Sequence, residues 1–184
     1  LRPAMKDYTI FIDGISKSLA ATGVRVGWAF GPANVIDKMK AILSHVGAWA
    51  PKAEQVATAK YLEMETAHNS YVSNIRNVID KRLEHFYKGF KKLREAGFKV
   101  DVIAPQAAIY LTVKLDLCGS VTHDGKQLTT QHDVTRYLLD EAGLALVPFY
   151  AFGSPEDSPW YRLSACAGRP NTWTTTIARV RAVI

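Results

Sequence analysis

The sequence has little cysteine, no long apolar run and no repeated segment. Only two of its 184 residues are cysteines. Cys118 and Cys166 stand singly, so neither a disulfide framework nor the paired spacing of a metal site is visible. No stretch approaches the roughly 18 apolar residues of a membrane span, and the first residues lack the basic and apolar regions of a signal peptide. These absences favour a globular protein of a reducing compartment, and we predict the cytoplasm and no membrane partner.

Patterns typical of metal and nucleic-acid binding are also missing. The five histidines show no His-x-x-x-His spacing and have no cysteine partner, so no metal site is predicted. The net charge of +6 could suit a polyanion, but the 23 basic residues are spread along the chain and concentrate only between Lys81 and Arg94. Without a binding motif we interpret that concentration as a solvated helix face and predict no nucleic-acid partner. The motif Gly-x-Ser-x-Gly does not occur, so the sequence gives no indication of a serine nucleophile.

Strand-like and helical patterns alternate along the chain. Between residues 71 and 96 apolar positions step by three or four, and Gly97 follows, which predicts one long amphipathic helix. Further helices are predicted at 32–45, 51–65, 130–141 and 172–184. Strands are predicted at 8–12, 25–30, 107–115, 144–149 and 160–165, with a loop at 13–23. This alternation indicates an α/β fold, which we divide near residue 70.

The ends of the sequence also carry an expectation. The chain begins with Leu1 rather than methionine and ends at Ile184 inside an apolar helical pattern. Because both ends look cut, we expect the chain to be part of a longer protein. Its 48% hydrophobic and 22% charged residues allow it to bury a sizeable core.

A lysine flanked by serines lies between the first two predicted strands, and an arginine follows eight positions later. An amine such as that of Lys17 can form a Schiff base with an aldehyde. A free lysine, with a pKa of about 10.4, must be perturbed or held in imine linkage to do so. Ser16 and Arg25 offer a hydroxyl and a planar guanidinium to phosphate oxygens. The pattern suits an aldehyde cofactor that carries a phosphate, although a lone loop lysine is more often a solvated charge.

This segment resembles that of a known enzyme family. The segment is similar to the cofactor-lysine segment of the fold-type I pyridoxal-phosphate aminotransferases, the class I/II aspartate aminotransferase superfamily. The shared pattern is Ser16-Lys17, a small and apolar stretch, the core Gly23-x-Arg25-x-Gly27 and a following Gly-Pro pair. The resemblance implies that Lys17 carries pyridoxal 5'-phosphate as a Schiff base and that Ser16 and Arg25 bind its phosphate. Many members have a serine three residues before the lysine, where this chain has Gly14.

A second segment far along the chain resembles the same family. Phe152-Gly153 and then the run from Trp160 to Ala165 look like its carboxylate-binding signature, in which arginine precedes Leu-Ser or Ile-Ser. On that resemblance Arg162 would bind the substrate α-carboxylate. A guanidinium presents paired donors that match a carboxylate bidentately, which agrees with this role. Without the resemblance, Arg162 could equally be a surface arginine on an edge strand.

The resemblance covers the whole chain but only the carboxyl-terminal half of the family's sequence. It implies part of the large cofactor-binding domain over 1–70, then a linking helix and the small α/β domain over 71–184. It also implies an aminotransferase of amino-acid metabolism, homodimeric at full length, that moves an amino group between an amino acid and a 2-oxo acid. We expect this fragment alone to be inactive.

The substrate and two other interpretations stay open. Dicarboxylate-specific family members have a partner-subunit arginine just before the helix that Pro51 opens, and 43–50 contains no arginine here. Trp49 in that stretch either reaches a site across a dimer or packs in the core, and we favour packing. The chain could instead be the cofactor-binding effector domain of a transcription regulator with the same fold, or a folded fragment without activity.

Overall fold

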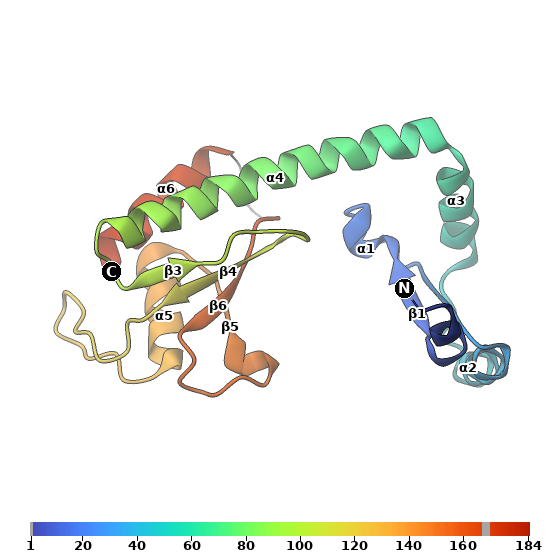
Figure 1. Cartoon of the computed structure of the whole chain (residues 1–184), viewed down its shortest axis with the longest axis horizontal. Helices are drawn as coiled ribbons and strands as arrows, with labels where there is room; N and C mark the ends of the chain where they lie inside the picture. Colours follow the sequence, from blue (N-terminus) through green and yellow to red (C-terminus); the bar gives the residue numbers. More distant parts are fainter. Residues whose placement is uncertain (1, 167–169) are drawn as a thin grey trace. The chain divides into compact units, whose positions relative to one another are not determined.

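The structure is a computed structural model that describes residues 2–166 and 170–184, and it mixes helices with strands (Figure 1). The chain divides into two compact units, Leu1–Arg76 and Asn77–Ile184, which we call unit 1 and unit 2. The long helix α4 (Glu65–Glu95) contributes residues to both. No helix in the described part of the chain is long and apolar enough to cross a membrane.

Unit 1 contains one small antiparallel sheet and several helices. Before α4 its elements are η1 (Pro3–Tyr8), β1 (Phe11–Gly14), α1 (Ile15–Ser18), β2 (Gly27–Phe30), α2 (Ala33–Val46) and α3 (Lys52–Glu63). Strands β1 and β2 pair from Phe11 opposite Phe30 to Gly14 opposite Gly27. A Cβ atom on Gly14 would lie 3.0 Å from the carbonyl oxygen of Val26. Glycine therefore permits the close approach of the two backbone segments where the pairing of β1 with β2 ends.

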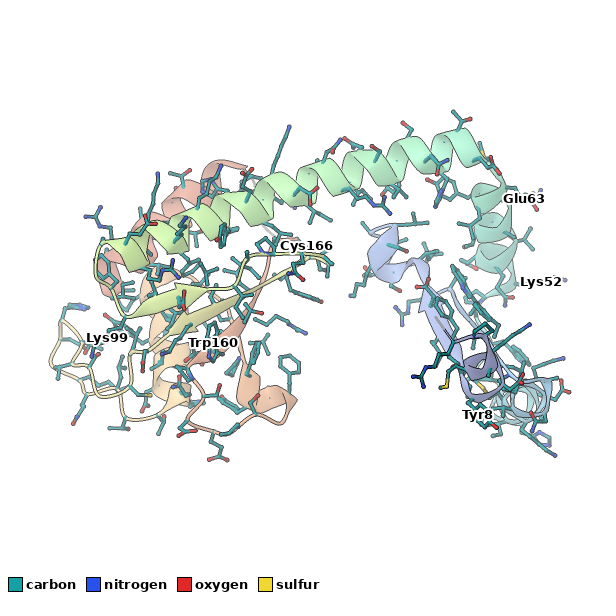
Figure 2. The ribbon with its side chains drawn as sticks, in the orientation of Figure 1. Tyr8, Lys52, Glu63, Lys99, Trp160 and Cys166 are labelled. Carbon is teal, nitrogen blue, oxygen red and sulfur yellow. The ribbon has the colours of Figure 1, made fainter. Side chains whose placement is uncertain are left out.

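Unit 1 buries few apolar side chains among its described residues. Its core cluster consists of Ile15, Leu19 and Val26, with partly buried neighbours that include Val72 of α4. The hydroxyl group of Tyr71, also on α4, donates a hydrogen bond of 3.0 Å to the carbonyl oxygen of Leu19. Tyr8, which is labelled in Figure 2, lies at the end of η1. Its side chain is 83% exposed. The cluster therefore fixes the short turn α1 against α4 and leaves much apolar surface uncovered.

Unit 2 is an antiparallel sheet covered by helices on its apolar face. Its elements after α4 are β3 (Val100–Val102), β4 (Tyr110–Leu115), α5 (Gln131–Ala142), β5 (Val147–Pro148), η2 (Phe149–Phe152), β6 (Trp160–Ser164) and α6 (Pro170–Val183). The strand order is β3-β4-β6-β5, and all neighbours are antiparallel. Burial alternates along β4 and β6, as expected when one face meets the core. Side chains of α4, α5 and α6 join that core.

The helices agree best with the sequence patterns. The α/β fold class is confirmed, and the predicted helices correspond to α2, α3, α4, α5 and α6. Thr130 caps α5 and Gly143 ends it in the left-handed conformation, with φ of 62°. The long helix begins six residues earlier than predicted, at Glu65, because only Met64 separates it from α3.

Several strand predictions were wrong in extent. Residues 3–8 form a 3₁₀ helix, so the first strand begins at Phe11 rather than at residue 8. The predicted loop 13–23 contains the end of β1 and the turn α1. The strand predicted at 107–115 begins only at Tyr110, because Ala108 has a left-handed φ of 64°. The strand predicted at 144–149 is reduced to two residues followed by η2.

Candidate functional site

Lys17 lies in the one-turn helix α1, directly after β1. The buried side chains of Ile15 and Leu19 hold this turn in the core of unit 1. The backbone N–H of Ile15 donates to the carbonyl oxygen of Val26 at 3.4 Å, and that of Leu19 donates to Ile15 at 3.1 Å. Lys17 itself is exposed, and Ser16 is half-buried. The turn therefore has an anchored apolar side and presents the lysine on its open side, between two strands as predicted.

Arg25 ends the loop that leads from α1 to β2. Its φ is 61°, in the left-handed region that residues with a side chain rarely adopt, so β2 starts at Gly27 rather than at residue 25 as predicted. The guanidinium Nη1 donates a hydrogen bond of 2.9 Å to the carbonyl oxygen of Thr22. The next residue, Val26, is buried in the core of unit 1. A left-handed arginine held between a core residue and its own loop is the kind of local strain found at binding sites.

A concavity of about 560 Å³ brings the predicted cofactor residues of unit 1 together. Its lining includes Ser16, Lys17 and Arg25, along with backbone at Gly14 and Gly27. Its volume falls within the range of small-molecule sites. It therefore combines an amine, a hydroxyl group and a guanidinium in one place.

Two further polar residues line this concavity and were not predicted as site residues. Ser18 adds a second hydroxyl group, which donates a hydrogen bond of 3.2 Å to the carbonyl oxygen of Gly14. Asp13 accepts a hydrogen bond of 2.7 Å from the backbone N–H of Gly14. The Ser-Lys-Ser triplet was the signal that could have identified Ser18, because a single helical turn keeps all three residues close.

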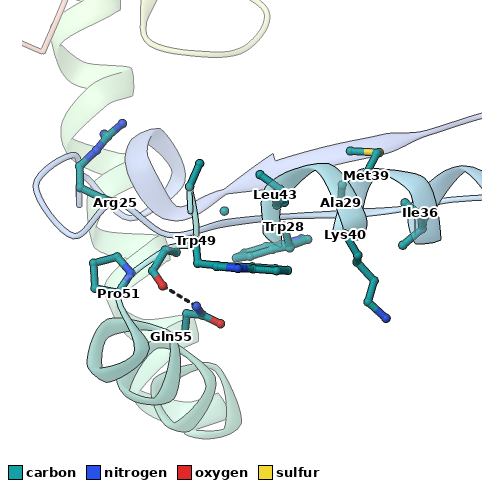
Figure 3. Close-up of a pocket in the computed structure, with 13 residues that line it drawn as sticks. Arg25, Trp28, Ala29, Ile36, Met39, Lys40, Leu43, Trp49, Pro51 and Gln55 are labelled. Carbon is teal, nitrogen blue, oxygen red and sulfur yellow. Dashed lines mark hydrogen bonds between the residues drawn. The ribbon is translucent and has the colours of Figure 1, made fainter. Parts of the chain in front are cut away.

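A second cavity, of about 610 Å³, lies beside Arg25 in unit 1 (Figure 3). It is lined by Trp28 of β2, by residues of α2 and by Trp49 in the connection to α3. Gln55 donates a hydrogen bond of 2.6 Å from its Nε2 to the carbonyl oxygen of Ala50, which fixes that connection. The favoured prediction that Trp49 packs in the core was wrong, because its side chain is 52% exposed and lines this cavity instead.

Arg162 lies in unit 2, in the middle of β6. It is paired with Thr112 of β4 on one side and with Val147 of β5 on the other, so the alternative of an edge strand was wrong. Its guanidinium carbon is 4.5 Å from the ring centroid of Tyr110 and 4.6 Å from that of Phe152. No described residue forms an ion pair or hydrogen bond with it. Its N–H donors are therefore available to a ligand.

Among the residues that the structure describes, no group of three histidine, cysteine or acidic side chains is arranged to hold a metal ion. The described cysteines, Cys118 and Cys166, are both free thiols.

Comparison with known proteins identifies the family. The family model described as aminotransferase class I and II matches residues 2–180. The aspartate aminotransferase of Rhizobium meliloti (strain 1021) is 29% identical over 165 residues, which are 89% of this chain and 38% of that protein. A bifunctional aspartate aminotransferase and glutamate/aspartate-prephenate aminotransferase of Petunia hybrida is 31% identical over 180 residues, 97% of this chain and 36% of that protein. The chain thus spans well under half the length of these relatives.

The fold agrees with the sequence comparison. The crystal structure of the aspartate aminotransferase from Rhizobium meliloti superposes with a TM-score of 0.82 at 28% identity, and the match covers 98% of this chain and 43% of that one. The resemblance found in the sequence, including its α/β architecture, is therefore confirmed. The transcription-regulator alternative is not favoured by these relatives. The chain belongs to the class I and II aminotransferase family.

Proposed function

We propose that the protein is a pyridoxal-phosphate-dependent aminotransferase that transfers an amino group between an amino acid and a 2-oxo acid. The observation that carries this proposal is the single concavity that Ser16, Lys17 and Arg25 line, in a chain of this family. Arg162 of unit 2 is proposed as the residue that binds the substrate carboxylate.

The donor set of the concavity suits a phosphorylated aldehyde. Lys17 supplies a primary amine on the open side of α1, where it is exposed. Ser16 and Arg25 supply a hydroxyl group and a guanidinium, which donate hydrogen bonds to phosphate oxygens. Pyridoxal phosphate, the cofactor of this family, supplies an electron sink for the bonds at the substrate Cα atom.

Lys17 is the proposed catalytic residue. Its amine would hold the aldehyde group of the cofactor. As a free amine Lys17 would remove the proton from the amino-acid Cα in one half-reaction and would return a proton to the corresponding carbon of the 2-oxo acid in the other. Such general base and acid catalysis contributes about 10²- to 10⁴-fold to the rate.

Arg162 is proposed to orient both substrates, because an amino acid and a 2-oxo acid share one carboxylate group. A guanidinium can donate two parallel hydrogen bonds to that group and so fixes the direction of the Cα atom. The guanidinium N–H donors of Arg162 form no hydrogen bond with a described residue, so they are available to this carboxylate. Lysine at the same position would supply only a point charge.

We leave the side-chain specificity of the substrate open. The relatives are named as aspartate aminotransferases, but the stretch 43–50 has no arginine that could read a second carboxylate. We also propose a homodimer in the cytoplasm for the protein at its full natural length. We expect the 184-residue chain alone to be inactive, since it spans well under half of its relatives and leaves apolar surface uncovered in unit 1.

The test is the visible absorbance band of a lysine-bound cofactor. The protein at its full natural length, mixed with pyridoxal phosphate, should show the band, and amino acids should convert it. Lys17→Ala should abolish both, whereas Lys38→Ala, an exposed lysine on α2, should keep them. Absence of the band in the wild type, or an unchanged band in Lys17→Ala, would contradict the proposal. A panel of amino donors would then define the substrate.

A further inference from the structure

Two aromatic rings contact the guanidinium of Arg162. The guanidinium carbon lies 4.5 Å from the ring centroid of Tyr110 and 4.6 Å from that of Phe152. At these distances the electron-rich face of each ring attracts the cation. No described residue forms an ion pair or a hydrogen bond with the guanidinium of Arg162. Within the described residues, the charged end of this side chain is therefore held by the two rings.

The register of the sheet places the first ring. Thr112 of β4 lies opposite Arg162, and Tyr110 lies opposite Ser164. Tyr110 is thus the diagonal neighbour of Arg162 on the same face of the sheet, within reach of a long side chain. The buried residues Leu111 and Leu163 point to the opposite face, toward the core. The pairing of β4 with β6 is therefore sufficient to bring Tyr110 to Arg162.

The turn after β5 places the second ring. Phe152 is the last residue of η2, and Gly153 reverses the chain there with a left-handed φ of 88°. The ring of Phe149 meets that of Phe152 edge to face, with 6.3 Å between centroids and 84° between planes. Phe152 is therefore supported within its own turn, although its side chain is mostly exposed.

Neither ring contact is a hydrogen bond, so the N–H donors of Arg162 stay available to a ligand. The guanidinium is planar, with its N–H donors directed outward in that plane. A long side chain that is already restricted loses less conformational freedom when a ligand binds. We propose that Tyr110 and Phe152 are positioning residues that restrict Arg162 before a carboxylate arrives. This inference rests on the proposed role of Arg162 in binding the substrate carboxylate.

Steady-state kinetics of the full-length holoenzyme test the inference. Phe152→Leu and Tyr110→Leu should each raise the KM for the amino donor and for the 2-oxo acid about two- to fivefold. Neither variant should change kcat by more than about twofold, because neither ring is proposed to contact the reacting atoms. Phe152→Tyr keeps the ring and should keep the KM of the wild type. Arg162→Ala should raise KM more than any ring variant.

A binding measurement gives the same information without turnover. Calorimetric titration of a 2-oxo acid should show weaker binding to Phe152→Leu by the same factor. In NMR spectra, the side-chain resonances of Arg162 should carry ring-current shifts that Phe152→Leu reduces and Phe152→Tyr retains.

The possible failures can be told apart. If Arg162→Ala raises KM but both ring-to-leucine variants keep it, the positioning role is wrong and the proposed function stands. If Phe152→Tyr and Phe152→Leu raise KM equally, the ring face is not what positions Arg162, and the inference is again overturned. If Arg162→Ala leaves both KM and 2-oxo-acid binding unchanged, the proposed carboxylate role fails, and the positioning role fails with it.

Discussion

Units 1 and 2 differ in the size of the apolar core that each one buries. In unit 2 the helices α4, α5 and α6 and the strands β3, β4 and β6 contribute to one continuous apolar cluster, in which Phe90, Val113 and Tyr161 are completely buried. Among the described residues of unit 1, the cluster has three buried members, all within or beside the turn of Lys17. The unit with the proposed catalytic lysine is therefore the one with the smaller core.

The surface of unit 1 shows what this difference means. On the two-stranded sheet Phe11 and Phe30 stack with 4.6 Å between ring centroids, yet Phe30 is 59% exposed. Ile12, on the other face of the sheet, is 73% exposed. A two-stranded sheet with uncovered apolar faces is only marginally stable in water. We infer that unit 1 needs further polypeptide against both faces, whereas the described contacts of Arg162 come from β4, β5 and η2 of unit 2.

The largest effect that should separate the two units comes from truncating one phenylalanine in each. In the 184-residue chain, Phe90→Ala should lower the free energy of unfolding of unit 2 by about 3–5 kcal/mol, because it leaves a cavity in a complete core. Phe30→Ala in unit 1 should change it by less than about 0.5 kcal/mol. Urea titration followed by circular dichroism measures both. Equal effects of the two substitutions would remove the distinction between the units.

A smaller effect should come from the contact between α4 and α6 in unit 2. A Cβ atom on Gly89 would lie 2.8 Å from both Cγ1 and Cδ1 of Ile177, so Gly89→Ala should destabilise unit 2 by about 1–3 kcal/mol. The control is the same change in an Ile177→Ala background, where the clash is gone. There alanine should stabilise the helix by up to about 1 kcal/mol relative to glycine. A similar loss of stability in both backgrounds would mean that the two helices are not packed as tightly as the structure has them.

The smallest effect should come from the cap of α5, also in unit 2. Thr130 accepts a hydrogen bond from the backbone N–H of Asp133 at 3.1 Å, and Thr130→Ala should cost about 1 kcal/mol. Side-chain hydrogen bonds from Thr129 and then Thr130 lower the pKa of Asp133 from 3.8 to about 2. Because folding lowers this pKa, Asp133 stabilises the folded state above about pH 4. This contribution to the free energy of unfolding is lost as the pH falls toward about 2.

Thermal melts between pH 2 and pH 6 test this titration. Asp133→Asn should remove part of the pH dependence in the lower half of that range. Asp140→Asn, near the other end of α5, is the matched control, since that carboxylate contacts Arg136 and takes no part in the cap. If Asp133→Asn leaves the pH dependence unchanged, the capping box contributes nothing to the acid stability of unit 2.

Local signals explain which parts of the fold could be predicted. The boundaries of α5 follow from Thr130 and Gly143, which act within a few residues of their own position. The three-residue strand β3 was missed because it forms only against β4, through pairs such as Val102 with Val113. The limits of β1 depend likewise on its pairing with β2. Strand limits are set by partners distant in the chain, which local patterns do not specify.

The same reasoning applies to the sites. Ser16, Lys17 and Arg25 could be found because their spacing in the sequence carries the resemblance, and the structure brings them into one concavity. The left-handed backbone of Arg25 could not be found, since no glycine or asparagine marks it. The contact of Arg162 with Tyr110 could not be found either, because it depends on the register between β4 and β6.

The most direct test of the central claim is to find which lysine carries the cofactor. The protein at its full natural length is saturated with pyridoxal phosphate, reduced with borohydride to fix the bond, and digested with trypsin. Because a modified lysine resists trypsin, attachment at Lys17 predicts a cofactor-bearing peptide of residues 7–25 in place of the peptide 7–17. Full recovery of the unmodified peptide 7–17, or attachment to any other lysine, would contradict the account.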